Sequence, residues 1–336
     1  MDFHLELTPR AFDTRIRHKD KIMLIGSCFT EQIGNKLAKH KFRVMDNPNG
    51  ILFNPLSITK SINSYLVNKH YREDDLFYQN ECWNSWDHHS RFSNIDKERC
   101  LQLINDSRDK AHAFLKEADW LLITLGSAYV YELKDIPDAK KDAYGSLVAN
   151  CHKVPTDKFN KRLLEEEEII DSFQQTITEL VLNNPSLKII FTISPVRHLR
   201  EGFVENNISK ATLIKAVHKL TCDKVFYFPA YELIIDDLRD YRFYAEDMIH
   251  PNYSATNYVW NKFVSTCMDD ESVELMKEIN EINAAHSHKA FNPGSVAHQK
   301  FKEVYRIKVI RLQEKYPYLQ LDKELEYFKA GDGNSA

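Results

Sequence analysis

Short apolar runs recur along the chain, and small or polar residues end each of them. The runs cover residues 21–26, 41–45, 120–126, 188–194 and 224–228. A parallel sheet requires continuous apolar runs of this length when helices cover both of its faces. The pattern therefore predicts five buried parallel strands.

Between these runs, apolar residues recur at spacings of three and four, which is the period of an amphipathic helix. They are Ile169, Phe173, Ile177 and Leu180 in 161–182, and Leu213, Val217 and Leu220 in 209–220. Residues 30–40 predict a further helix. Strands that alternate with helices imply right-handed crossovers. We therefore expect an α/β fold with three layers, in which helices cover both faces of a doubly wound parallel sheet.

Two segments depart from this alternation. Residues 47–118 form a long insertion between the second and third strands, rich in aromatic residues and histidines. Long insertions are usually functional or pack as caps. After about residue 268 the chain becomes helical and charged. We predict one domain over 1–268, which contains the insertion, and a helical C-terminal extension over 269–336.

Charge and cysteine spacing narrow the class of protein. The 45 basic and 49 acidic residues are intermixed, which argues against nucleic-acid or membrane partners. The six cysteines include no CxxC pair, so we expect reduced thiols and neither a disulfide framework nor a zinc site. The sequence shows no signal-like segment and no apolar run of about 18 residues. These features predict a cytoplasmic protein, and they leave its oligomeric state open.

The segment GSCFT, residues 26–30, stands where the first strand ends and a helix begins. Open α/β sheets bind ligands at the carboxyl ends of their strands, and the N–H groups at the start of a helix stabilise an anion there. Gly26 permits a tight turn and a close approach by substrate. Taken alone, Ser27 is more simply explained as the cap of the following helix. Ser27 is also placed to act as a nucleophile.

A second pattern favours the nucleophile. Asp247 precedes His250 by three residues, after the fifth strand. This spacing brings the two side chains to the same side of one turn, so that the carboxylate holds Nδ1–H and leaves Nε2 as a base. A serine after the first strand and this pair after the last predict a Ser-His-Asp triad. We expect the neighbouring Cys28 to be an ordinary buried thiol.

The histidines of the insertion and of the segment NCHKVP (150–155) invite a metal interpretation. They are His88, His89 and His152. Metal sites favour HxxxH or HxH spacing with a carboxylate, and neither occurs here. We therefore predict no metal and no cofactor, and expect these histidines to contact substrate or to be structural.

The serine and the Asp-x-x-His pair resemble SGNH hydrolases, the superfamily of GDSL esterases and lipases. More narrowly, the chain resembles the GSCFA family, a bacterial branch of that superfamily. Besides GSCFT, the segments that carry this resemblance are FNPLSI (53–58), TLGSAYVYE (124–132), NCHKVP (150–155), SPVRH (194–198) and RFYAEDMIHP (242–251). The resemblance covers roughly residues 1–265. It implies the flavodoxin-like SGNH fold, with Ser27 as nucleophile, His250 as general base and later acid, and Asp247 as the carboxylate that orients it.

The resemblance also implies donors to an oxyanion. The backbone N–H of Ser27 is expected to be one, and Gly50 matches the glycine that follows the second strand in the superfamily. The usual GxND motif departs from its pattern here, because Ala128 stands where the asparagine would be. Losing one such donor costs about 10²–10³ in rate. Asn54, Ser127 and Asn150 are the candidate replacements.

We expect a serine esterase or O-acyltransferase that acts on small acyl esters, chiefly acetyl esters of a carbohydrate. Trp83, Trp86 and Tyr71 of the insertion are candidates to stack on sugar rings. Arg197 and His198 follow the fourth strand and either contact substrate or form a structural salt bridge. The expected substrate-binding residues are Gly126, His89, Asn150, His152, Arg197 and His198.

Two other functions stay open. The altered GxND motif also suits a catalytically impaired protein that binds carbohydrate without turning it over. The C-terminal helices, in turn, could serve oligomerisation or partner docking around an active domain.

Overall fold

A sheet of five parallel strands forms the centre of the molecule. A computed structural model describes residues 4–134 and 146–329. The strands are β1 (Lys21–Gly26), β2 (Arg43–Asp46), β5 (Trp120–Leu125), β9 (Lys188–Ile193) and β10 (Val225–Phe228). Their order across the sheet is β10-β9-β5-β1-β2, and all neighbours pair in parallel. The predicted five-stranded, doubly wound sheet is confirmed, with the strand order of flavodoxin-like folds.

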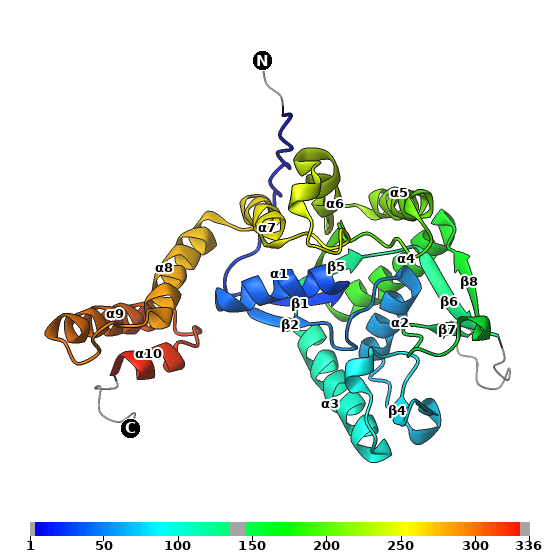
Figure 1. Cartoon of the computed structure of the whole chain (residues 1–336), viewed down its shortest axis with the longest axis horizontal. Helices are drawn as coiled ribbons and strands as arrows, with labels where there is room; N and C mark the ends of the chain where they lie inside the picture. The colour runs from blue at the N-terminus through cyan, green and yellow to red at the C-terminus, as the bar shows by residue number, and fades with distance from the viewer. Residues whose placement is uncertain (1–3, 135–145, 330–336) are drawn as a thin grey trace.

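Helices cover both faces of this sheet (Figure 1). On one face, α2 (Pro55–Leu66), α3 (Lys97–Lys116), α4 (Glu166–Asn183) and α5 (Phe203–Leu220) bury apolar residues against β5 and β9. On the other face lie α1 (Cys28–Lys39) and α7 (Tyr253–Cys267), with the short helix α6 (Ala230–Glu232) and a π-helical turn, η5 (Leu233–Leu238). Alternate residues of each strand enter the two cores, because side chains alternate between the faces of a sheet. The predicted three layers are confirmed.

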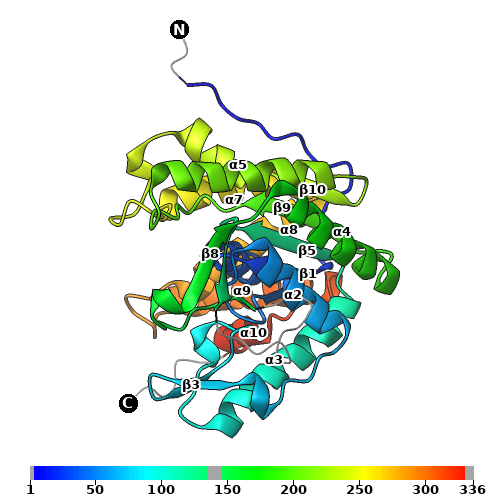
Figure 2. The ribbon, with the colours of Figure 1, turned by 90° about the vertical axis from the view of Figure 1, so that its right-hand side faces the viewer.

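The insertion 47–118 differs from a simple cap. Its two long helices, α2 and α3, pack directly on the sheet, and they complete the crossover from β2 to β5. A small hairpin of β3 (Phe77–Gln79) and β4 (Cys82–Asn84) stands between them in sequence. Figure 2 shows this hairpin beside α3, on the side of the molecule away from α5 and α7. Most of the insertion is therefore part of the helical layer.

Three boundaries predicted from periodicity are wrong. Residues 161–163 end a strand, β8 (Phe159–Leu163), which pairs antiparallel with β6 (Tyr129–Leu133) in a small sheet that also contains β7 (Leu147–Val148). Helix α4 begins at Glu166, because Glu165 and Glu168 form a capping box there. Helix α5 begins at Phe203, six residues before the predicted start at 209. The apolar pattern did not reveal its first turns, because their buried face is polar. Strand β2 begins two residues later than predicted, since Lys41 has a positive φ of 64° in the turn before it.

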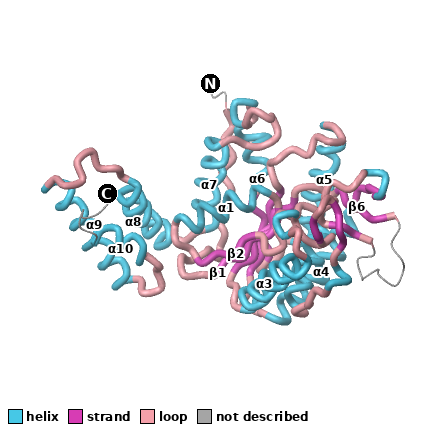
Figure 3. The backbone as a smooth tube through the Cα atoms, turned by 60° about the horizontal axis from the view of Figure 1, so that its bottom comes forward, coloured by secondary structure: helices cyan, strands magenta, loops and turns pink. Residues whose placement is uncertain are grey.

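The C-terminal helices α8 (Asp270–Ser287), α9 (Val296–Lys315) and α10 (Asp322–Lys329) form a group with its own apolar core. Figures 1 and 3 show this group beside the β2 end of the sheet. Two polar contacts join it to the end of α1: Asn283 Nδ2 donates to the Lys39 carbonyl at 2.8 Å, and Lys41 Nζ lies 2.6 Å from Glu324 Oε1. The predicted division near residue 268 falls between α7 and α8.

Replacing Phe191 tests the core of the sheet. Phe191 is fully buried on β9 and meets Phe173 of α4 edge to face, with ring centroids 4.9 Å apart. We expect Phe191→Ala to lower the free energy of unfolding by about 3–5 kcal/mol in urea titrations, because it leaves a cavity. The control is Leu182→Ala on α4, where the side chain is 71% exposed and a change within about 0.5 kcal/mol is expected. Equal losses in the two variants would contradict this description of the core.

Candidate active site

Ser27 occupies the turn between β1 and α1. Its Oγ accepts a hydrogen bond from the Phe29 N–H at 3.3 Å, so Ser27 caps α1. Gly26 before it has a φ of 152°, and a Cβ at that position would lie 2.3 Å from the Thr124 carbonyl oxygen of β5. Only glycine fits so close an approach. The helix cap expected from sequence is confirmed, and the same turn holds Ser27 at the carboxyl edge of the sheet.

The neighbouring Cys28 is the first residue of α1. Burial raises the pKa of the Cys28 thiol above its usual range. A thiol is a strong nucleophile only as thiolate, so a raised pKa leaves Cys28 protonated and weakly reactive at neutral pH. Ser27 is the better candidate nucleophile in this turn.

Asp247 and His250 form the hydrogen-bonded pair that their spacing predicts. His250 Nδ1 lies 2.6 Å from Asp247 Oδ2. Asp247 Oδ1 also accepts the backbone N–H groups of Ile249 and His250, at 2.9 and 3.0 Å. These contacts, led by the His250 N–H, lower the pKa of Asp247 to about 2. The carboxylate is therefore ionised at neutral pH and only accepts hydrogen bonds, which makes Nδ1 the donor in this pair.

The pair stands on a tight loop, whereas sequence suggested a helical turn. Met248 has a positive φ of 59°, and the Ala245 N–H donates to the His250 carbonyl at 2.7 Å across the loop. Both side chains are close to half exposed, at 47% for Asp247 and 43% for His250. The imidazole is therefore held in place by its partner but is open to solvent.

Backbone hydrogen bonds gather the loops of this edge of the sheet. The loop after β9 is tied to β5 by the Ser194 N–H, which donates to the Leu125 carbonyl at 2.7 Å. The same loop meets the pair's loop where the Arg197 N–H donates to the Ile249 carbonyl at 3.2 Å. The Ser27 N–H donates to the Thr124 carbonyl of β5 at 3.3 Å. Strand β5 thus stands between the candidate nucleophile and the loop that carries the candidate base.

No hydrogen bond joins Ser27 to His250 within residues 4–134 and 146–329. The Ser27 Oγ is bonded to the Phe29 N–H, and the His250 ring is bonded to Asp247. Catalytic hydrogen bonds often tighten only when substrate is bound. The triad therefore stays a prediction.

His198 lies between the strand ends. Its Nε2 would be 3.0 Å from a Cβ on Gly126, so the ring packs against the turn after β5. The pKa of His198 is lowered to about 3, first by burial and then by the positive charge of Lys210. His198 is therefore neutral near pH 7, and it lies near enough to His250 that a charge on that ring would oppose its protonation further.

The two candidate oxyanion donors of the loop after β2 are engaged within the protein. The Gly50 N–H donates to the Asn47 carbonyl at 2.7 Å, and Gly50 has a φ of 81° with no room for a Cβ beside His89. Asn54 caps α2: its Oδ1 accepts the Ser57 N–H at 2.8 Å, and its Nδ2 donates to Ser57 Oγ at 2.9 Å. Gly50 must give up this bond before its N–H binds an oxyanion, whereas Asn54 Nδ2 carries a second N–H beside the one that Ser57 accepts.

The backbone N–H groups of residues 126–129, where a GxND motif was expected, also donate within the protein. The Gly126 and Ser127 N–H groups donate to the Phe53 carbonyl at 2.7 and 3.0 Å. The Ala128 N–H donates to Ser209 Oγ at 2.8 Å, and the Tyr129 N–H donates to Ser127 Oγ at 3.1 Å. The Ser127 hydroxyl is therefore part of an internal network, and its oxyanion role stays a prediction.

The predicted substrate-binding residues form two groups. Gly126, Arg197 and His198 lie at the ends of β5 and β9, next to the loop of His250. His89, Asn150 and His152 instead gather around residues 85–89: His152 Nε2 lies 2.8 Å from the Ser85 carbonyl, the Asn150 Oδ1 accepts the His152 N–H, and the His89 N–H donates to the Asn49 carbonyl. The residues of the second group are bonded mainly to segments 49–89 and 150–152, and not to the ends of β5 and β9.

Arg197 is held by aromatic rings. Its guanidinium lies 4.1 Å from the ring centroid of Tyr244 and 4.9 Å from that of Tyr241. Cation–π contacts with these two rings stabilise the guanidinium. The salt bridge considered as an alternative stays a prediction.

The expected sugar-stacking role is wrong for Tyr71. It is 2% exposed, and its hydroxyl donates to Asp87 Oδ2 at 3.1 Å. Trp86 is partly buried and stacks one face on Phe77, with ring centroids 3.6 Å apart and planes 9° from parallel. For Trp83 and Trp86 the role stays a prediction.

Lys210 on α5 is a site residue that the sequence analysis missed. It is 1% exposed, and its Nζ donates to the carbonyls of Gly126 and Ser194 at 2.6 and 2.7 Å. The available signal was its spacing, because Lys210 is in register with the apolar positions Leu213 and Val217 and therefore lies on the buried face of the helix.

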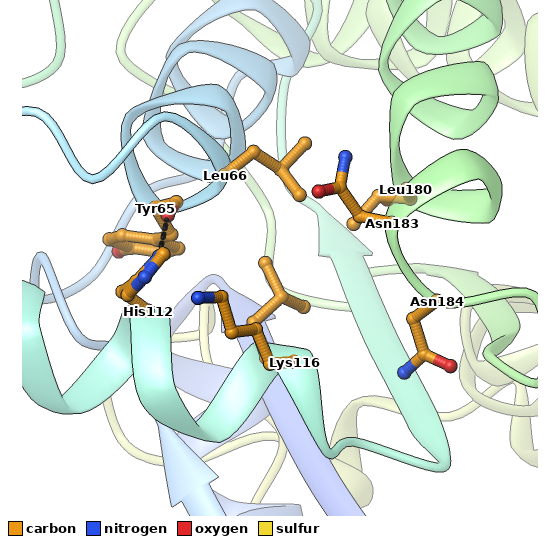
Figure 4. A pocket seen from close by; sticks show the side chains of 8 residues that line it. Tyr65, Leu66, His112, Lys116, Leu180, Asn183 and Asn184 are labelled. Carbon is orange, nitrogen blue, oxygen red and sulfur yellow. Dashed lines mark hydrogen bonds between the residues drawn. The ribbon is translucent and has the colours of Figure 1, made fainter.

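A crevice between α2, α3 and α4 lies at the opposite edge of the sheet. Figure 4 shows it lined by Tyr65, Leu66, His112, Lys116, Leu180, Asn183 and Asn184. Asn184 donates to the Ala118 carbonyl just before β5 begins, so the crevice faces the amino ends of the strands. Its volume of about 10 Å³ holds at most one water molecule. It is not part of the candidate site.

Metal sites and membrane spans concern the described residues, 4–134 and 146–329. No group of three or more His, Cys, Asp or Glu side chains lies close enough together there to hold a metal ion. In the same residues, no helix combines the length and apolar composition needed to cross a membrane.

Comparisons with known proteins give a family and distant structural likenesses. A model of the GSCFA family matches residues 21–263, and a model of the C-terminal domain of GSCFA domain proteins matches residues 279–331. No curated protein matches the sequence.

The chain is similar to a solved carbohydrate esterase of family 3 from Talaromyces cellulolyticus, with 10% sequence identity and a TM-score of 0.34. The match covers 78% of this chain and 99% of the esterase. It is also similar to a mutant acetyl esterase solved with acetate ion, with 11% identity and a TM-score of 0.35 over the same shares. Likenesses this distant do not bear on activity.

The lowered pKa of His198 predicts a pH dependence of stability. The unfolded chain takes up a proton at His198 below about pH 6.5, whereas the folded protein does so only near pH 3. The unfolded state therefore binds more protons in this window, and the stability due to neutral His198 is lost as the pH falls from about 6.5. Urea titrations of wild type and His198→Gln should show the wild-type free energy of unfolding falling faster between pH 7.5 and 4.5. A difference between the two proteins that is constant with pH would contradict the assignment.

Proposed function

Because the chain belongs to the GSCFA family, we propose that it is a serine esterase or O-acyltransferase of the SGNH type. It acts on small acyl esters, chiefly acetyl esters of a carbohydrate, through Ser27, His250 and Asp247. The observation that carries the proposal is the Asp247–His250 pair, with Nδ1 and Oδ2 2.6 Å apart. Its loop is bonded to the segment after β9, and β5 alone separates β9 from β1, the strand that ends at Ser27.

In this proposal, the Ser27 hydroxyl attacks the ester carbonyl while His250 Nε2 takes its proton. The tetrahedral intermediate collapses when the C–O bond to the alcohol breaks, and His250 returns the proton to the leaving oxygen. Ser27 is then acylated. Water, or another hydroxyl in a transferase, attacks the acyl group with His250 again as base, and Ser27 is released. Asp247 stays ionised throughout and stabilises the imidazolium.

The start of helix α1 supports the negative charge in this scheme. Ser27 is its N-cap and Cys28 its first residue. The Phe29 and Thr30 N–H groups donate to Ser27 Oγ and to the Ser27 carbonyl, so the first turn points its N–H groups toward Ser27. Their dipoles favour an anion at this point. The Ser27 and Gly50 N–H groups join only by exchanging the internal bonds described above. The Asn54 amide has a second N–H and can join while it keeps its bond to Ser57.

The nature of the substrate rests on the family resemblance. With Tyr71 buried and Trp86 stacked on Phe77, the insertion offers fewer aromatic faces to a sugar ring than the sequence suggested. Arg197 and His198 lie next to the loop of His250 and are the nearer candidates for contact with the alcohol part of the ester.

One observation favours the second candidate, a protein that binds carbohydrate esters without turning them over. All four backbone N–H groups from Gly126 to Tyr129 donate within the protein. An oxyanion hole that lacks this contribution lowers the rate by about 10²–10³. Binding of acetylated sugars, measured by calorimetry, without release of acetate would favour this function over the first.

A fluorophosphonate probe tests the nucleophile. Such probes form a covalent adduct with an activated serine. We expect wild type to gain one adduct by mass spectrometry and Ser27→Ala to gain none. Cys28→Ala is the matched control from the same turn and should label like wild type. Absence of labelling in wild type, or labelling that survives in Ser27→Ala, would refute a nucleophilic Ser27.

The His250 and Asp247 side chains can be tested by turnover. We expect His250→Ala to lower kcat/KM for p-nitrophenyl acetate and acetylated sugars by about 10²–10⁴-fold, because the base is lost. Asp247→Asn should cause a loss in the same range, because the amide no longer orients and stabilises the imidazolium. Circular dichroism checks that both variants fold. Activity in His250→Ala within a factor of two of wild type would rule out the base.

A further inference from the structure

The first turns of α5 present polar residues to the protein interior. Asn206, Ser209 and Lys210 are 5%, 2% and 1% exposed, and they share one face of the helix. Farther along the same face stand the apolar residues Leu213 and Val217. We call the three polar residues the α5 clamp. A polar turn buried at this depth requires partners, because unpaired polar groups are costly inside a protein.

The partners are backbone groups of the two loops at the candidate active site. Lys210 Nζ donates to the Gly126 carbonyl after β5 and to the Ser194 carbonyl after β9, at 2.6 and 2.7 Å. Ser209 Oγ accepts the Ala128 N–H at 2.8 Å. Asn206 Oδ1 accepts the His198 N–H at 2.9 Å. Each loop is therefore held at two points by one helical turn.

Lys210 has the most demanding position of the three. Within the described part of the chain, no carboxylate forms a salt bridge with it, and the face of the Tyr231 ring lies 5.7 Å from its Nζ. A buried amine without a paired charge must satisfy its N–H groups with neutral acceptors, and the two carbonyls supply them. Apolar residues would pack this face at lower cost, as Leu213 and Val217 do. The polar clamp therefore needs a reason other than stability.

The position of the α5 clamp next to the candidate catalytic groups explains why this face is polar. Gly126 packs against His198, and the Arg197 N–H donates to the Ile249 carbonyl, next to His250. Thr124, two residues before Gly126, accepts the Ser27 N–H. The clamp thus holds the two segments through which Ser27 and the loop of His250 are connected.

We infer that the α5 clamp is a set of positioning residues that fixes the loops after β5 and β9, and with them the geometry between Ser27 and His250. The clamp touches no reacting atom and acts through Gly126, Ser194 and His198. This inference rests on the proposed function for its effect on catalysis, but its effect on the two loops is independent of any activity.

The decisive variant is Lys210→Met, which keeps most of the side-chain volume and removes the donors. We expect kcat to fall about 10–100-fold while KM changes less than about threefold, since displacement of catalytic groups by about 1 Å costs this much in rate. Amide hydrogen exchange at 126–128 and 194–198 should become faster. Lys210→Gln restores N–H donors without a charge and should recover part of both effects.

Controls separate the clamp from general destabilisation. Lys215→Met, on the exposed side of the same helix, removes a surface pair with Glu166 and should leave kcat and the exchange of both loops unchanged. Where Lys210→Met does not fold, Ser209→Ala and Asn206→Ala remove one acceptor each without burying a charge. They should speed exchange at Ala128 and His198, respectively.

The outcomes distinguish this inference from the proposed function. Exchange in both loops that stays at the wild-type rate in a folded Lys210→Met protein, or in both alanine variants, overturns the clamp. Faster exchange with kcat unchanged also overturns it, because the loops would then not position the catalytic groups. When wild type neither labels with fluorophosphonate nor hydrolyses esters, the proposed function fails and hydrogen exchange alone decides on the clamp.

Discussion

The close approach of the Gly26 turn to strand β5 is the constraint on which the rest of the site depends. The Thr124 carbonyl leaves no room for a side chain at Gly26, and it accepts the Ser27 N–H. Ser27 can therefore cap α1 and still stand at the edge where β5 and β9 end. The hydrogen bonds from Ser194 to Leu125 and from Arg197 to Ile249 continue this edge toward His250. The candidate nucleophile and the candidate base are thus connected through backbone bonds.

The titratable groups at this edge differ in burial and in charge. Asp247 is ionised and accepts hydrogen bonds from His250 and from the Ile249 N–H, while burial and the charge of Lys210 hold His198 neutral. Burial also lowers the pKa of Lys210, to about 7. The buried Lys210 amine thus stands behind the loops, and the half-exposed pair faces solvent. In the proposed acyl transfer, the accessible pair supplies the base and the buried amine supports the loops that position it.

Predictions from sequence were correct where they depend on residues close together in the chain. They were wrong where a side chain or strand contacts a residue that is remote in sequence. The apolar runs predicted the five strands, and the spacing of Asp247 and His250 predicted their hydrogen bond. By contrast, Tyr71 looked like a sugar-binding residue because nothing nearby in sequence shows that its hydroxyl donates to Asp87. Strand β8 was mistaken for helix because its pairing with β6 connects residues about thirty positions apart.

The sequence by itself determined the layered α/β fold, the cap at Ser27 and the acid–base pair, because each follows from periodicity or from residues within one turn. Only the tertiary structure decided which donors are free. It binds the N–H groups of Gly50 and of residues 126–129 internally, and it buries Lys210 behind the loops. The physical reason is that a backbone N–H or a lysine amine bonds to the acceptors that the fold places next to it. These acceptors are remote in sequence, so residue spacing does not predict them.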